Sequence, residues 1–295
     1  MSGRRLLIVH ASADLYGSDR ACLAIARAAT AHYEVHVVVP WRGPLVERLE
    51  AAGATTHVFD PLVLRKSELR GLSGLITPLR WVRAAVRLER FARRGRFDVV
   101  HSNCVTTIGG RLLARRFKAP HVWHVHELFA DDAVARFVFE HLLRGADCIV
   151  AASSSVADQF RSSELRARCV VAHTGADVPD TVARIQPLQR APARLVCVGR
   201  LNAWKGQDDL IDAVALLRDE GVEVHLDLVG DVYAHEHHFR DRLVARVRAL
   251  DLDARVSFLG ERADALELMG AADIVVIPSA SPEPFGMVVV EAMAL

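Results

Sequence analysis

The sequence has no apolar stretch that approaches the ~20 residues of a transmembrane helix. Its five cysteines are scattered, odd in number and without a C-x-x-C pair, which is typical of reduced, mostly buried thiols in a cytosolic protein. The formal net charge is only +1, so no overall field favours nucleic acid. With 295 residues that are 51% hydrophobic and 25% charged, we expect one large or two medium globular domains.

Two common nucleotide-binding signatures are also missing. The turn at residues 12–19 is not a G-x-G-x-x-G sequence, which argues against dinucleotide binding. Residues 198–207 do not fit the Walker pattern G-x-x-x-x-G-K-[ST], which argues against a P-loop. Lysine is scarce as well, since it occurs only at positions 66, 118 and 205. Lys205 is therefore conspicuous.

Short Val- and Ile-rich runs alternate with longer helical patterns along the whole chain. This alternation predicts an α/β protein with parallel sheets covered by helices on both faces. A proline-bearing segment near residues 177–192 interrupts the pattern and is typical of a linker. We therefore expect two Rossmann-like domains facing a cleft, at residues 1–186 and 187–295. The strand-like runs are 6–9, 35–39, 56–59, 99–101, 122–126, 149–152, 170–173, 194–199, 224–229, 256–259 and 274–277.

The last part of the chain combines a strand, a loop and a helix. The apolar run 274–277 predicts a buried strand, prolines at 278, 282 and 284 predict an irregular loop, and Gly286 opens a helical pattern. Ligands of open parallel sheets bind beyond the carboxyl ends of the strands. Free amides at Gly286 and Met287, together with the helix dipole, would favour a phosphate there. Glu283 in the loop and Glu291 in the helix are candidates for sugar and ribose hydroxyls.

The spacing Glu283-x7-Glu291, with Pro-Phe-Gly after the first glutamate, resembles the signature of the family 4 retaining glycosyltransferases. The resemblance implies the GT-B architecture of two facing Rossmann-like domains. The plain alternative is a solvated loop glutamate and an exposed helical one. A second motif supports the resemblance, because residues 198–206 match the family's Gly-Arg-Leu…Lys-Gly. In the family, the residues corresponding to Arg200 and Lys205, next to Gly199, hold the donor diphosphate as the leaving group.

Two further positions lie in the predicted N-terminal domain. Gly17 lies in a strand-to-helix turn where a backbone can approach a ligand closely, and in the family this glycine loop meets acceptor or donor phosphate. An ordinary capped turn, with Ser18 or Asp19 as the cap, is the alternative. Strand periodicity places His124 and His126 on one face, and His126 matches the family histidine that reaches the donor sugar.

The resemblance implies a metal-independent hexosyltransferase that moves a sugar from a nucleotide-diphosphate sugar to a hydroxyl acceptor with retention of configuration. Arg200 and Lys205 would neutralise the departing diphosphate, helped by amides at Phe285, Gly286 and Met287. No cofactor is implied, because the nucleotide sugar is a co-substrate. Two alternatives stay open: a nucleotide-sugar epimerase on the same fold, and a relative that binds nucleotide sugars without catalysis.

A predicted helix near residues 75–92 carries a basic face. Arg80, Arg83, Arg87, Arg90 and Arg94 fall on one side at helical spacing, while Trp81, Val82, Ala85 and Leu88 fall on another side. Two interpretations stay open: a solvated face on a helix packed against its sheet, or a patch that docks on anionic lipid. We expect a cytoplasmic protein, and the second interpretation adds peripheral attachment to the inner face of the membrane and a lipid-linked acceptor.

The sequence stops within a helical pattern, because Glu291–Leu295 contains no Gly, Asn or Pro to end the helix. The predicted second domain has only four strand-like runs against seven in the first. In the family, further strands and helices follow this point. We therefore expect a fragment whose parent reading frame continues beyond Leu295, and a second domain that is incomplete.

Overall fold

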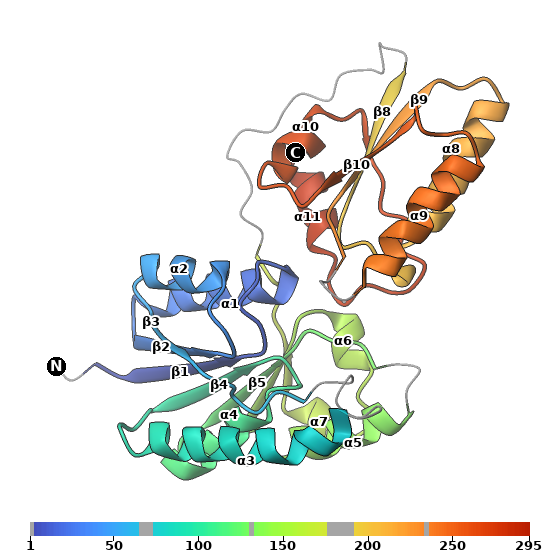
Figure 1. Ribbon diagram of the computed structural model, residues 1–295. Coiled ribbons are helices and arrows are strands. Elements are labelled where there is room, and N and C mark those ends of the chain that lie inside the picture. Colours follow the sequence, from blue (N-terminus) through green and yellow to red (C-terminus); the bar gives the residue numbers. More distant parts are fainter. Residues whose placement is uncertain (1–2, 65–72, 130–132, 176–191, 233–235) are drawn as a thin grey trace. The chain divides into compact units, whose positions relative to one another are not determined.

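The computed structural model in Figure 1 describes residues 3–64, 73–129, 133–175, 192–232 and 236–295. The chain divides into two compact units, Met1–Gly175 and Ala176–Leu295, which are treated separately below. The predicted proline-bearing linker and the predicted boundary between residues 186 and 187 fall within 176–191, outside the described residues. The division into two α/β units agrees with the alternating pattern of the sequence.

The N-terminal unit contains a parallel sheet of seven strands in the order β3-β2-β1-β4-β5-β6-β7. The chain starts in the middle of the sheet, extends to one edge, crosses back and then extends to the other edge. Such strands are Val- and Ile-rich because helices bury both of their faces. The strands are β1 (Arg5–His10), β2 (Glu34–Val39), β3 (Thr55–Val58), β4 (Val99–Asn103), β5 (His121–Val125), β6 (Cys148–Ala151) and β7 (Cys169–Val171).

Helices cover both faces of this sheet (Figure 1). Successive side chains of a strand point to opposite faces, so Leu6 and Ile8 pack with α1 and α2, whereas Leu7 and Val9 pack with α3 and α4. The helices are α1 (Gly17–Ala29), α2 (Pro44–Ala51), α3 (Ser73–Ala92), α4 (Ile108–Phe117), α5 (Ala133–Leu143), α6 (Ser154–Asp158) and α7 (Ser163–Ala167).

The C-terminal unit contains a parallel sheet of four strands in the order β10-β9-β8-β11. Leu195 and Leu226 pack with α8 and α9 on one face, and Val196 and Val229 pack with α10 and α11 on the other. The strands are β8 (Ala193–Val198), β9 (Val224–Val229), β10 (Val256–Gly260) and β11 (Ile274–Val275), and the helices are α8 (Gln207–Asp219), α9 (His237–Ala249), α10 (Ala265–Ala271) and α11 (Met287–Ala294).

The predicted buried strand at 274–277 is wrong in length and in burial. Regular pairing is limited to Ile274 and Val275, which lie opposite Leu195 and Val196 of β8. Ile274 is 48% exposed. The physical reason is that β11 is the edge strand of the described sheet, so only one of its sides is paired.

Several histidines are buried within the N-terminal sheet. His101, His121 and His124 are 9%, 2% and 5% exposed. Burial disfavours the charged imidazolium, so it lowers the pKa of His101 to about 3 and the pKa of His121 and of His124 to about 4. Each ring is therefore neutral in the folded protein at pH 7.

Because these histidines are buried in the neutral form, we expect the free energy of unfolding to fall in mild acid. A histidine whose folded pKa lies below its unfolded value of about 6.5 contributes its full stability above that pH, and this contribution falls as the pH drops toward the folded pKa. Each of the three should cost about 1.4 kcal/mol in the free energy of unfolding for each pH unit below 6.5. Urea denaturation at several pH values between 7.5 and 5.0 measures this slope.

His121→Gln is expected to reduce the slope by about 1.4 kcal/mol per pH unit, because one titrating group is lost. His32→Gln, at an exposed position, controls for the removal of a surface histidine. An unfolding free energy that stays constant between pH 7.5 and 5.0 would contradict the assignment of neutral buried rings.

Candidate functional site

Lys205 and Glu283 form an ion pair in the C-terminal unit. The chain leaves β8 at Gly199, and a 3₁₀ turn at Ala203–Lys205 then leads into α8. Lys205 Nζ donates to Glu283 Oε1 at 2.6 Å, and the two side chains are 16% and 18% exposed. The Ser279 hydroxyl donates to the same oxygen at 2.5 Å. The turn after β8 and the loop after β11 thus place opposite charges together, although 78 residues separate them in sequence.

The backbones of this turn and this loop are also in direct contact. Gly206 has a φ of +73°, and a Cβ atom there would lie 2.1 Å from the carbonyl oxygen of Pro278. Only glycine fits this position, because it tolerates the left-handed conformation and leaves room for the carbonyl. The amide of Ala280 donates to the carbonyl of Trp204 at 2.9 Å and fixes the same contact from the other side.

Arg200 lies at the carboxyl end of β8 and is partly buried. Hydrogen bonds hold the backbone on both sides of it, since the Gly199 amide donates to Val229 at 2.9 Å and Gln207 Nε2 donates to the Arg200 carbonyl at 3.0 Å. Gly199 has a φ of +154°. The motif predicted from residues 198–206 therefore forms a hydrogen-bonded turn beyond the strand end, where ligands of parallel sheets bind.

The C-terminal glutamate motif divides between a loop and a helix, as predicted. Gly286 has a φ of +79° and forms the N-cap of α11, so the first helical residue is Met287. Phe285 and Met287 are partly buried. The alternative of an exposed helical glutamate is wrong for Glu291, because its side chain is only 3% exposed. It points into the packed side of α11 and not into solvent.

In the N-terminal unit, His126 directly follows β5. Its Nε2 lies 3.0 Å from Asn103 Oδ1, at the end of β4. Its ring stacks on the ring of His124 with centroids 4.0 Å apart, which confirms that both histidines lie on one face. Burial and the neighbouring histidines hold the pKa of His126 well below 6.5, so this ring is neutral at pH 7.

Gly17 is the first residue of α1 and is exposed. The N-cap residue is Tyr16 and not Ser18 or Asp19, but the Asp19 side chain takes part in a capping box at this end of the helix. Asp19 is the third helical residue, and its Oδ2 accepts from the Tyr16 amide at 2.9 Å. Its other oxygen lies 2.7 Å from Nε2 of His10, and both side chains are buried. Asp19 therefore connects the start of α1 to the end of β1.

Sequence reasoning missed four polar residues at this edge of the sheet. His10, Asn103 and Glu127 each lie at or just after a strand end, and Asp19 pairs with the first of them. Burial raises the pKa of Glu127, whose Oε2 accepts from the amides of His126 and Val105 at 3.0 and 3.3 Å. The rule that ligands bind beyond strand ends, applied to every polar residue there, would have found three of them.

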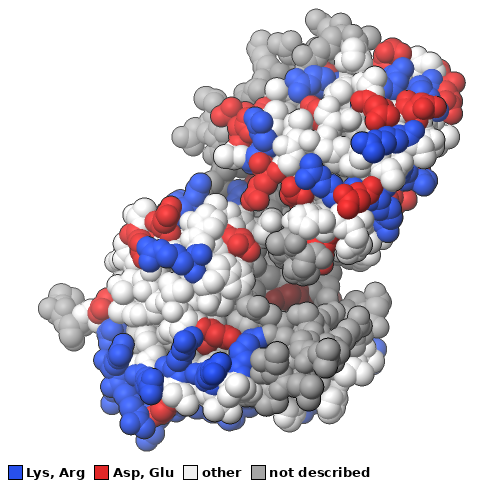
Figure 2. All heavy atoms as spheres, in the orientation of Figure 1, with Lys and Arg blue, Asp and Glu red and all other residues white. Residues whose placement is uncertain are grey.

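The basic face of α3 is narrower than predicted. Arg80 donates to Asp60 Oδ2 at 2.6 Å and to the Val63 carbonyl at 2.9 Å. Its side chain therefore connects α3 to the segment that follows β3. Arg83, Arg87, Arg90 and Arg94 are exposed, and Figure 2 shows basic side chains gathered over this part of the unit.

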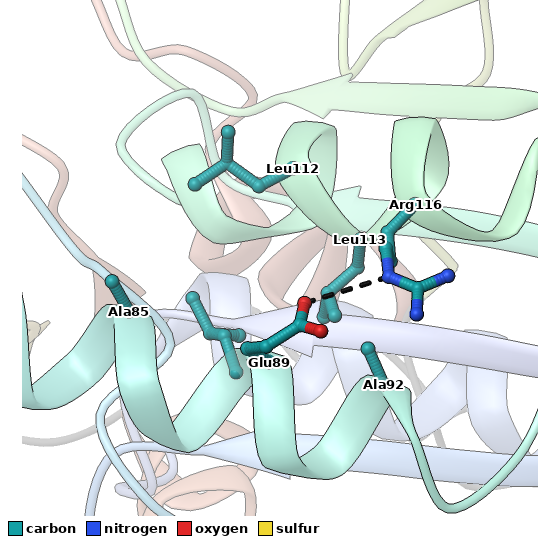
Figure 3. A pocket seen from close by; sticks show the side chains of 7 residues that line it. Ala85, Glu89, Ala92, Leu112, Leu113 and Arg116 are labelled. Carbon is teal, nitrogen blue, oxygen red and sulfur yellow. Dashed lines mark ion pairs between the residues drawn. The ribbon is translucent and has the colours of Figure 1, made fainter.

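Exposed apolar side chains accompany these arginines. The buried stripe of α3 is Ala84, Leu88 and Ala92, whereas Val82 is 60% exposed. Figure 3 shows a shallow groove between α3 and α4. Ala85, Ala92, Leu112 and Leu113 line it, and Glu89 pairs with Arg116 across it at 3.5 Å.

All five cysteines are free thiols, and Cys22, Cys104 and Cys197 are buried. Within the described ranges, no three His, Cys, Asp or Glu side chains gather closely enough to hold a metal ion. None of the helices in the part of the chain that the structure describes is long and apolar enough to cross a bilayer.

The sequence matches two known protein families. Residues 16–179 match the family described as Glycosyltransferase Family 4, and residues 180–295 match the family described as Glycosyl transferases group 1. The first match covers more than half of the 295 residues. The chain belongs to glycosyltransferase family 4.

Individual relatives agree with this assignment. Glycogen synthase of Mycobacterium tuberculosis is 29% identical over 232 residues, covering 72% of this chain and 54% of that protein. D-inositol 3-phosphate glycosyltransferase of Pseudarthrobacter chlorophenolicus is 30% identical over 247 residues, covering 70% and 55%. The chain therefore spans about half the length of the curated relatives it matches.

The fold is shared with a solved structure. The crystal structure of HepE from Anabaena in complex with UDP matches with a TM-score of 0.74 and 25% identity, over 98% of this chain and 78% of that one. The predicted fold class, α/β with Rossmann-like domains of the GT-B type, is confirmed.

Proposed function

We propose that the chain is the catalytic part of a retaining glycosyltransferase. It would move a sugar from a nucleotide-diphosphate sugar to a hydroxyl acceptor in polysaccharide or glycolipid biosynthesis. The observation that carries this proposal is the Lys205–Glu283 pair, held at 2.6 Å at the strand-end edge where Arg200 also lies. Membership of glycosyltransferase family 4 supports it, as does the likeness to a protein solved in complex with UDP.

The proposed leaving-group site consists of two cations and one helix end. Arg200 and Lys205 would each form charge-assisted hydrogen bonds to the diphosphate, whose negative charge grows as the sugar departs. The amides at Phe285, Gly286 and Met287 lie at the N-terminus of α11, where the helix dipole favours an anion. The nucleotide base and the sugar stay open.

Glu283 would orient the sugar of the donor. Lys205 and Ser279 hold its Oε1 through two short hydrogen bonds. A diphosphate that binds Lys205 would compete with Glu283 for the same ammonium group and release its carboxylate toward the sugar hydroxyls. Glu291 would contact the ribose only after its buried carboxylate becomes accessible.

In the N-terminal unit, we propose that Gly17 and His126 contact the acceptor or the donor sugar. Gly17 leaves the exposed start of α1 open to close approach by a ligand backbone or phosphate. His126 is partly exposed and neutral, so it would accept or donate one hydrogen bond to a hydroxyl group and carry no charge.

Replacing the two cations should weaken nucleotide binding and slow transfer. Lys205→Ala and Arg200→Ala each remove a charge-assisted contact of roughly 1.5–3 kcal/mol, which corresponds to tenfold or more in rate or affinity. Calorimetry with UDP, GDP and ADP, followed by transfer kinetics at saturating donor, measures the effect.

Lys205→Ala also leaves Glu283 without its ion-pair partner, so Glu283→Gln should be measured beside it. Arg248→Ala, which removes an exposed arginine on α9, is the matched control and should leave affinity and rate within twofold. Wild-type values of kcat and KM in both Lys205→Ala and Arg200→Ala would refute the site.

We further propose that transfer requires no metal ion, because Arg200, Lys205 and the end of α11 supply the positive charge that the diphosphate needs. Transfer rates should therefore be the same within twofold before and after dialysis against EDTA. A rate that vanishes in EDTA and returns with Mg²⁺ or Mn²⁺ would contradict this part of the mechanism.

We propose in addition that α3 attaches the protein to an anionic membrane surface, on the cytoplasmic side, and that the acceptor is lipid-linked. Support comes from four exposed arginines beside the exposed side chains of Leu79, Val82 and Val86. Arginine heads would contact lipid phosphates while the aliphatic groups enter the interface.

Binding to vesicles that contain anionic lipid should be strong at low salt and weak at high salt. Each arginine near such a surface contributes about 1 kcal/mol, so the triple variant Arg83→Gln, Arg87→Gln and Arg90→Gln should bind roughly a hundredfold more weakly. Vesicle sedimentation measures this. The control removes the same charge from the other unit, through Arg242→Gln, Arg246→Gln and Arg248→Gln on α9. Equal binding by both triple variants would refute the role of α3.

A further inference from the structure

Asn103 is the central residue of a buried hydrogen-bond chain in the N-terminal unit. Its side-chain Oδ1 lies 3.0 Å from His126 Nε2, and its Nδ2 lies 3.0 Å from the carbonyl oxygen of Ser18 at the start of α1. The same Nδ2 packs against His10 Nδ1 at 3.1 Å, but this contact is not a hydrogen bond when Nδ1 donates to the backbone carbonyl of Asn103. Asn103 therefore touches three segments that come from β1, α1 and β5, and its own side chain is fully buried.

The Ser18 carbonyl determines the orientation of the Asn103 amide. A carbonyl oxygen can only accept, so the amide atom that faces it must be the Nδ2 group, which donates. The opposite atom, Oδ1, then faces His126. Because Oδ1 can only accept, Nε2 of His126 must carry the proton.

The Asp19–His10 pair contacts the backbone of Asn103. His10 Nε2 lies 2.7 Å from Asp19 Oδ1, and His10 Nδ1 lies 2.9 Å from the backbone carbonyl of Asn103. Both His10 and Asp19 are buried, so water does not compete for the contacts between them and Asn103. Asn103 is thus fixed through its backbone as well as through its side chain.

His126 has one ring nitrogen left for a ligand. No described residue hydrogen-bonds its Nδ1, and the side chain is partly exposed. We propose that Asn103 is a positioning residue that holds His126 as the Nε2–H tautomer, so that Nδ1 accepts a hydrogen bond from a hydroxyl group of the bound sugar. The contact with a sugar hydroxyl rests on the proposed glycosyltransferase function. The assignment of the tautomer does not.

Histidine-detected ¹H–¹⁵N spectra of the full chain test the tautomer directly. The His126 signals are identified by their absence in His126→Gln. At pH 7.5 the wild-type protein should show a protonated Nε2 and an unprotonated Nδ1 for this ring. Asn103→Asp keeps an acceptor at the same place and should keep this tautomer, whereas Asn103→Leu removes the acceptor and should produce a mixture or the Nδ1–H form.

Ser102→Ala is the matched control, because Ser102 is the buried neighbour on the opposite face and bonds His121 Nε2 at 2.9 Å. It should change the His121 signals and leave those of His126 as they are. A wild-type His126 protonated on Nδ1 would overturn the proposal even where a variant fails to fold. An unchanged His126 tautomer in folded Asn103→Leu would overturn it as well.

Kinetics separate the two parts of the inference. Asn103→Leu should lower kcat tenfold or more while the affinity for UDP, GDP or ADP stays within twofold, because the diphosphate contacts lie elsewhere. A changed tautomer together with an unchanged kcat would overturn the contact with the sugar hydroxyl. Absence of transfer by the wild-type chain with any nucleotide sugar would refute the proposed function, and with it that contact, while the spectra would still decide the role of Asn103.

Discussion

The parallel register between β1, β4 and β5 decides where the polar groups of the N-terminal unit lie. His10 is opposite Asn103, and Asn103 is opposite His124, so three side chains of one face stand side by side across the sheet. A shift of one residue in either pairing would turn one of them to the other face, where α3 and α4 pack. The hydrogen-bond chain to His126 exists only in this register.

Burial gives these polar groups their chemical character. Water would allow His101, His124 and His126 to exchange protons near pH 6.5, but burial in the packed sheet lowers their pKa values and keeps these three rings neutral. A neutral imidazole has one donor and one acceptor, so its partners determine which nitrogen does which. The C-terminal unit differs, because Lys205 and Glu283 there form an ion pair between two partly buried side chains.

The sequence was sufficient to predict most strands and the alternation that defines the fold, because Val- and Ile-rich runs and glycine turns are local signals. It did not predict the short, exposed β11, since pairing at a sheet edge depends on which strand lies next to it. Arg80 looked like a member of a free basic face, but its partner Asp60 is distant in sequence. The family motifs indicated Arg200, Lys205 and Glu283. Asn103 belongs to no motif, and only the strand register shows that it lies beside His10 and His124.

The close contact between Gly206 and the Pro278 carbonyl has a consequence for motion. The turn that carries Lys205 and the loop that carries Glu283 cannot slide past each other without breaking this contact and the bond from Ala280 to Trp204. In the proposed site, exchange of the Lys205–Glu283 pair for a diphosphate would then proceed by rotation of side chains on this backbone. Such rotations take picoseconds to nanoseconds at accessible positions, whereas loop displacement takes nanoseconds to microseconds. At the proposed diphosphate site, this exchange should therefore need no displacement of the turn or of the loop.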